Sequence, residues 1–128
     1  MEVVYIAGPY TARLQRDIEK NVERARQVAI ELLQQGYAVI CPHTMTHRFE
    51  KEIPDVKVFY ESDCELVRRC DSIYMLMFYT DSRGAMRELQ VARDCGKRIY
   101  FEGSEKCGIP GVGREPFQGG EFTRDDLQ

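Results

Sequence analysis

A glutamate lies on the apolar side of a predicted helix, where an unpaired charge is costly. At 100° per residue, the segment 80–97 places Glu88 within a stripe formed by Ala85, Leu89 and Ala92. Burial of such a charge costs several kcal/mol or shifts the pKa of its group. An inward carboxylate can also do chemistry, because it can stabilise positive charge or attack an electrophilic carbon.

The helix predicted over 57–70 repeats this anomaly. Asp63 lies near the middle of its apolar face, together with Phe59 and Cys70. A capping or ion-paired group explains one such carboxylate better than catalysis does. Two of them on helices that flank the same strand favour a shared site, because like charges in a low-dielectric site perturb each other's pKa. We therefore predict Asp63 and Glu88 as catalytic residues.

Strands and helices alternate along the chain, and this order indicates how the two carboxylates meet. Short runs rich in Val, Ile, Tyr and Phe predict strands at 2–8, 37–42, 72–78 and 98–102, with helices at about 17–35, 57–70 and 80–97. Strands separated by helices imply right-handed crossovers and a parallel sheet. We predict a three-layer α/β fold of the flavodoxin-like or Rossmann-like type, with strand order 2-1-3-4. In that order the chain reverses direction between strands one and three, which opens a crevice at their C-terminal ends.

Two loops, GPYT (8–11) and FYTDS (78–82), would line this crevice. Gly8 permits close approach of the backbone to a ligand, and Pro9 ends the strand. Ser82 can cap the next helix, whose first N–H groups form an anion site. Turn and cap chemistry alone explains Gly8 and Ser82. Combined with the inward glutamate, they predict a pocket with a phosphate or hydroxyl binder at its mouth and a carboxylate inside.

Three segments between residues 3 and 102, VYIAGPY, ESDCELVRRCDSIYML and DSRGAMREL, resemble the nucleoside 2-deoxyribosyltransferase superfamily. They are most similar to the 2′-deoxynucleoside 5′-phosphate N-hydrolases and to small phage and bacterial relatives of uncharacterised function. The specific part of the resemblance is the spacing of five residues: Asp63, Asp71, Ser82, Gly84 and Glu88.

The resemblance implies a role for three of these positions. It makes Glu88 the nucleophile on the sugar and Asp63 its supporting aspartate. Six residues before the nucleophile, the transferases have an aspartate and the nucleotide hydrolases a serine that contacts the 5′-phosphate, so Ser82 favours the hydrolases. In the first loop the hydrolases carry a further phosphate-binding serine, where this chain has Pro9.

We therefore predict an N-glycosidase that hydrolyses the N-glycosidic bond of a (deoxy)nucleoside 5′-monophosphate through a glutamate nucleophile. Cleavage builds positive charge on C1′, and an inward carboxylate stabilises that charge before it forms a glycosyl ester. Two alternatives stay open. One is a transferase that exchanges bases between deoxynucleosides, and the other is a nucleotide-binding module without turnover.

Several further residues are expected in the pocket wall. The predicted substrate-binding residues are Gly8, Pro9, Tyr10, His43, Ser82 and Gly84. Tyr5 and Tyr79 are weaker candidates, because tyrosines in strands are usually packing residues. The segment CPHTMTH (41–47) offers two histidines and a cysteine. No further ligand follows at a spacing known from families of metal sites, so we expect a pocket wall or a base-stacking loop. We expect no metal and no cofactor.

Composition narrows the class of protein. A length of 128 residues with 43% hydrophobic content predicts one domain over 1–128 with a sizeable core. No apolar run approaches the length of a membrane span. A net charge of -3 without a basic stripe argues against a nucleic-acid polymer as partner and leaves small molecules. The five cysteines lack CxxC spacing, which favours reduced thiols in a cytoplasm.

The segment 103–128 changes character and is rich in glycine and proline. We expect it to be loop, an extra edge strand or partner-dependent structure. The pockets of the superfamily are completed across a subunit interface, so the resemblance also implies a homo-oligomer, most simply a two-fold dimer.

Overall fold

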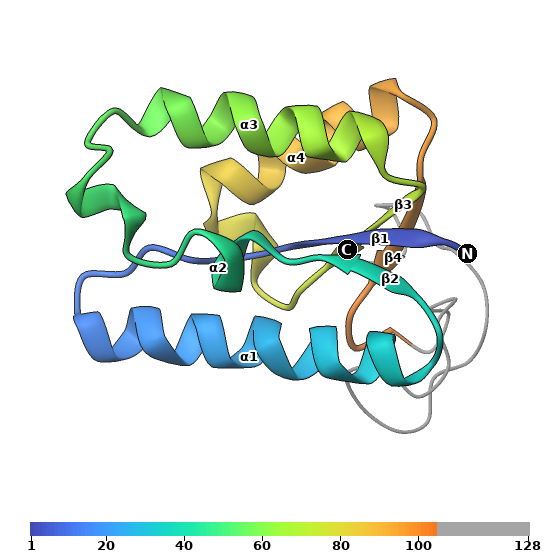
Figure 1. Cartoon of the computed structure of the whole chain (residues 1–128), viewed down its shortest axis with the longest axis horizontal. Coiled ribbons are helices and arrows are strands. Elements are labelled where there is room, and N and C mark those ends of the chain that lie inside the picture. Colours follow the sequence, from blue (N-terminus) through green and yellow to red (C-terminus); the bar gives the residue numbers. More distant parts are fainter. Residues whose placement is uncertain (105–128) are drawn as a thin grey trace.

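A four-stranded parallel sheet forms the centre of the molecule (Figure 1). The structure is a computed structural model that describes residues 1–104. Its strands are β1 (Val3–Ala7), β2 (Ala38–Ile40), β3 (Ser72–Met75) and β4 (Arg98–Phe101), in the order β2-β1-β3-β4. At the centre, Tyr5 of β1 lies between Ile40 of β2 and Ile73 of β3. The predicted fold class and strand order are confirmed.

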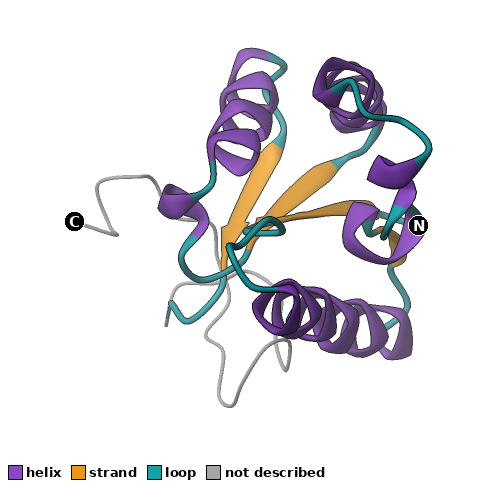
Figure 2. Ribbon diagram, turned by 90° about the vertical axis from the view of Figure 1, so that its left-hand side faces the viewer, coloured by secondary structure: helices purple, strands orange, loops and turns teal. Residues whose placement is uncertain are grey.

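Helices cover both faces of the sheet, which gives three layers (Figures 1 and 2). The long helix α1 (Gln15–Gln34) covers one face, and α3 (Val56–Arg69) and α4 (Arg83–Asp94) cover the other. Three short elements lie in the connections: α2 (Pro42–Met45), η1 (Phe49–Lys51) and η2 (Tyr79–Asp81). Among residues 1–104, no helix has both the length and the apolar character that crossing a membrane requires.

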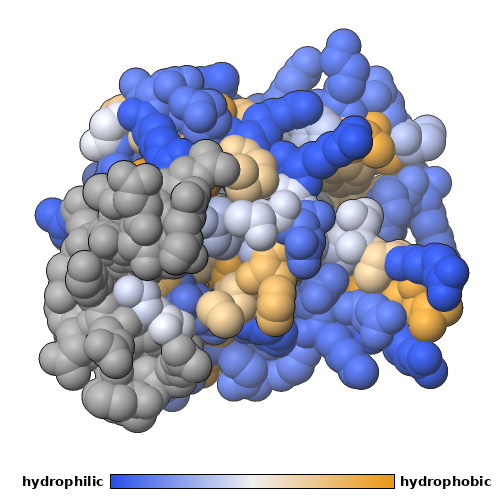
Figure 3. All heavy atoms as spheres, turned by 180° about the vertical axis from the view of Figure 1, so that it is seen from behind, coloured by the Kyte–Doolittle hydropathy of each residue, from blue (hydrophilic) through white to orange (hydrophobic). Residues whose placement is uncertain are grey.

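Burial follows from this layering. All four residues of β3 and four of the five in β1 are buried, as expected for central strands covered on both faces. On α4, the buried side is formed by Ala85, Leu89 and Ala92, with Glu88 among them. On the face seen in Figure 3, hydrophilic side chains predominate and apolar ones form small separate areas.

The boundaries of several elements differ from those predicted. The third strand ends at Met75 instead of continuing to residue 78, and Phe78 adopts a left-handed conformation with φ 66° where η2 begins. The segment after β2 contains a short helix where a loop was expected, since Pro42 occupies its first position and its fixed φ suits a helix start. The proposed extra edge strand lies outside the described residues.

Candidate active site

A cavity of about 880 Å³ lies beyond the C-terminal ends of β1 and β3. Its size is typical of sites for small molecules. All eight predicted site residues line it: Gly8, Pro9, Tyr10, His43, Asp63, Ser82, Gly84 and Glu88. The structure therefore brings together residues from four separate parts of the chain, at the crevice expected from the strand order.

Glu88 is the buried acid of this cavity. Only 9% of the residue is exposed, and its Oε2 accepts a 2.9 Å hydrogen bond from the hydroxyl of Tyr5. Burial raises the pKa of Glu88 to about 8, and the charge of Asp63 adds to this shift, while Tyr5 and Arg87 oppose it. This shift favours the protonated form of Glu88 at neutral pH.

Asp63 faces the same cavity from α3, which packs against α4. It is half-buried, and burial raises the pKa of its carboxyl to about 6. Because its charge also raises the pKa of Glu88, the two groups titrate as a pair. Two acids whose environments hold their pKa values apart are a common arrangement in acid–base catalysis.

Tyr5, a weaker candidate in the sequence, is the hydrogen-bond partner of Glu88. Its ring is fully buried in β1, and burial followed by the charge of Glu88 raises the pKa of its hydroxyl well above the ordinary value. The phenol therefore stays protonated and donates to the carboxyl group of Glu88. Its only signal in the sequence was its position on a central strand, where tyrosine is usually a packing residue.

Ser82 caps α4, as predicted. Its hydroxyl oxygen accepts a 3.1 Å hydrogen bond from the backbone N–H of Ala85. Arg83 and Arg24 also line the cavity, although Arg24 is paired with Glu102 at 2.8 Å. The start of α4 therefore offers a hydroxyl, backbone N–H groups and nearby positive charge, a combination that suits an anion.

Gly8 packs closely against Leu76 and also lines the cavity, so its role in the approach of a ligand stays a prediction. A Cβ at this position would lie 2.7 Å from both Cβ and Cδ1 of Leu76. We expect Gly8→Ala to lower the free energy of unfolding by about 1–3 kcal/mol, because overpacking forces neighbouring atoms to shift. Urea denaturation would measure this loss. Gly84→Ala is the matched control, since its Cβ would meet Tyr60 at an ordinary 3.4 Å; equal midpoints for the two variants would contradict the assignment.

His43 and Pro9 form one wall of the cavity. The ring Nε2 of His43 donates to the carbonyl oxygen of Pro9 at 2.9 Å, and burial lowers the pKa of the imidazole. His43 is thus held neutral, and contact with substrate stays a prediction. His47 instead contacts Tyr10 and Glu19. Within residues 1–104, no three His, Cys, Asp or Glu side chains are grouped so that they could hold a metal ion.

The sequence and the fold were compared with those of known proteins. Residues 2–101 match the model of a domain of unknown function, DUF4406. A solved 2-deoxyribosyltransferase of the psychrotolerant bacterium Bacillus psychrosaccharolyticus, described as a biocatalyst for the synthesis of antiviral and antitumoral nucleosides, aligns with a TM-score of 0.54 and 19% identity. The alignment covers 98% of this chain and 89% of that chain, and it shows a shared fold. No curated protein matches the sequence.

Proposed function

Because this chain belongs to the DUF4406 family and shares the fold of a 2-deoxyribosyltransferase, we propose that it cleaves the N-glycosidic bond of a nucleoside 5′-monophosphate. The observation that carries the proposal is the buried carboxyl of Glu88, which lines the cavity next to the hydroxyl of Tyr5. A glycosyl nucleophile needs such a position, rigid, partly dry and beside its substrate.

In the proposed reaction, the carboxylate of Glu88 attacks C1′ and forms a glycosyl ester. The bond from C1′ to the base nitrogen breaks, its electron pair leaves with the base, and Asp63 donates a proton to that base. Water then attacks C1′ of the ester and gives its proton to Asp63. The bond from C1′ to the Glu88 oxygen breaks, its electron pair returns to the carboxylate, and the sugar phosphate is released, which restores both carboxyls. Tyr5 holds the carboxylate of Glu88 in place by hydrogen bonding.

This scheme needs one proton on the pair, with Glu88 ionised and Asp63 protonated at the moment of attack. The pKa values place that proton mainly on Glu88 before the reaction. It must therefore pass to Asp63 as positive charge develops on C1′, because that charge favours the ionised form of Glu88. The pair holds one proton between about pH 6 and about pH 8, the pKa values of Asp63 and Glu88. We expect a bell-shaped profile of kcat/KM with its maximum in that window, because below it no nucleophile is ionised and above it no acid remains. In Asp63→Asn the fall at high pH should disappear. A flat profile from pH 5 to 9 would refute the shared proton.

The direct test is to incubate the protein with matched nucleosides and 5′-monophosphates and to quantify released base by chromatography. Adding a second free base to the same reaction separates hydrolysis from base transfer, since a transferase would form a new nucleoside. Binding without any release would instead favour the non-catalytic module. The resemblance also implies a two-fold dimer, and this stays a prediction.

A further inference from the structure

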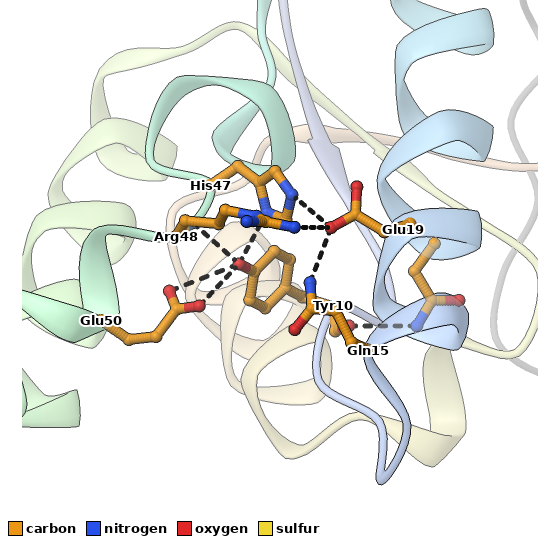
Figure 4. Close-up of polar contacts among 7 residues, drawn as sticks. Tyr10, Gln15, Glu19, His47, Arg48 and Glu50 are labelled. Carbon is orange, nitrogen blue, oxygen red and sulfur yellow. Dashed lines mark hydrogen bonds and ion pairs between the residues drawn. The ribbon is translucent and has the colours of Figure 1, made fainter.

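A network of polar side chains surrounds Tyr10 at the wall of the cavity (Figure 4). The hydroxyl of Tyr10 lies 2.9 Å from Nδ1 of His47 and accepts a 3.2 Å hydrogen bond from the backbone N–H of Arg48. On α1, Glu19 accepts from Nε2 of His47 at 3.0 Å and from Arg48 at 3.2 Å. The network therefore ties the segment after α2 to α1 and to the loop that follows β1.

The backbone of this segment is held in an unfavourable conformation. Arg48 has φ 69°, in the left-handed region that non-glycine residues rarely adopt. Such a conformation persists only where surrounding contacts fix it, and it is found often at functional sites. Here the contacts are those of the Arg48 N–H with Tyr10 and of its guanidinium with Glu19. The structure thus fixes the course of the chain immediately before Glu50.

Glu50 is the acidic group that this arrangement presents to the cavity. Both of its carboxylate oxygens lie 3.3 Å from the hydroxyl of Tyr10, and the residue lines the cavity. In the described part of the chain Glu50 forms no ion pair, since Arg48 of the same segment is paired with Glu19. A carboxylate has about four acceptor sites, and the single phenolic proton, whether it goes to Glu50 or to Nδ1 of His47, leaves most of them free.

We propose that Glu50, oriented by Tyr10, selects the base of the substrate by accepting a hydrogen bond from an exocyclic amino group. The class of ligand, a nucleoside 5′-monophosphate, is taken from the proposed function, on which this inference rests. A carboxylate only accepts, so an amino group at this place is favoured, whereas an oxo group presents lone pairs to a negative charge. Sites built around such a polar contact reject analogues that lack the donor more strongly than apolar pockets do.

The natural bases provide matched probes for this selection. Adenine and hypoxanthine differ by an amino and an oxo group at C6 and by a proton on the neighbouring N1. Cytosine and uracil form a second such pair, at C4 and N3. We would measure dissociation constants for the four 2′-deoxynucleoside 5′-monophosphates by calorimetry, in a Glu88→Gln background that blocks formation of the glycosyl ester. The amino member of at least one pair should bind about tenfold more tightly, as expected for a hydrogen bond to a charged group.

Glu50→Gln should abolish this preference, because an amide side chain both accepts from an amino group and donates to an oxo group. Glu52→Gln is the control, since it removes a carboxylate from the same segment that does not line the cavity. Tyr10→Phe should reduce the preference, because it removes the hydroxyl that lies 3.3 Å from both carboxylate oxygens of Glu50.

The outcomes separate this inference from the proposed function. Binding without an amino preference, or with a preference that survives Glu50→Gln, would overturn the role of Glu50 and leave glycosidic cleavage intact. A preference lost in Glu50→Gln, combined with no base release by the wild-type protein, would support base selection and refute cleavage. Failure of all four nucleotides to bind would refute both.

Discussion

Replacing Glu88 with glutamine should abolish base release while the protein stays folded. The glutamine amide fits the space of the carboxyl and can still contact Tyr5, but it cannot form the glycosyl ester. We expect kcat/KM to fall by about 10³-fold or more, which corresponds to several kcal/mol of lost transition-state stabilisation. Chromatographic detection of released base from a nucleotide would measure the loss. Turnover close to that of the wild-type protein would rule out Glu88 as nucleophile.

The same variant carries its own control for folding. The pKa of Glu88 is about 8 in the folded protein and about 4.5 without its surroundings. As pH rises from 4.5 towards 8, the carboxyl of the unfolded chain ionises while the folded one stays protonated, so the wild-type protein loses stability relative to Glu88→Gln. The variant should therefore be more stable than the wild-type protein at pH 8, by up to several kcal/mol. An inactive variant that unfolds at lower urea concentration would not support the assignment.

The inward carboxylates could be predicted because a helix fixes the direction of each side chain locally. A rotation of 100° per residue is enough to place Glu88 and Asp63 on the buried sides of α4 and α3. The alternation of elements predicted a parallel sheet, and the order 2-1-3-4 of a doubly wound sheet predicted a crevice where the chain reverses direction. Both arguments need only neighbouring residues and general topology.

The contacts of these carboxylates could not be predicted in the same way. β1 is covered on both faces, so its sequence does not show which face Tyr5 occupies or that its hydroxyl meets Glu88. The network around Tyr10 depends on a left-handed arginine at position 48, and nothing in the local sequence indicates a positive φ there. These features arise from packing between distant segments.

Substrate choice at the start of α4 depends on Ser82, and Ser82→Asp tests it. The hydroxyl of Ser82 caps the helix, and aspartate is an equally good cap, so the variant should fold normally. If a 5′-phosphate binds there, the new carboxylate repels it. At an effective dielectric near 20, two unit charges about 4 Å apart repel by about 4 kcal/mol, although solvent reduces this at the mouth of a cavity.

We therefore expect kcat/KM on 5′-monophosphates to fall more than tenfold in Ser82→Asp, since even about 1.4 kcal/mol of net repulsion gives that factor. Activity on uncharged nucleosides should fall less or rise, because they bring no charge to the helix start. Ser82→Thr, which keeps both the hydroxyl and the cap, is the matched control and should retain the preference of the wild-type protein. The decisive quantity is the ratio of kcat/KM for a nucleotide and its nucleoside in all three proteins. An unchanged ratio in Ser82→Asp would mean that Ser82 is a helix cap alone and that the phosphate is recognised elsewhere, for example by Arg24 or Arg83 in the same cavity.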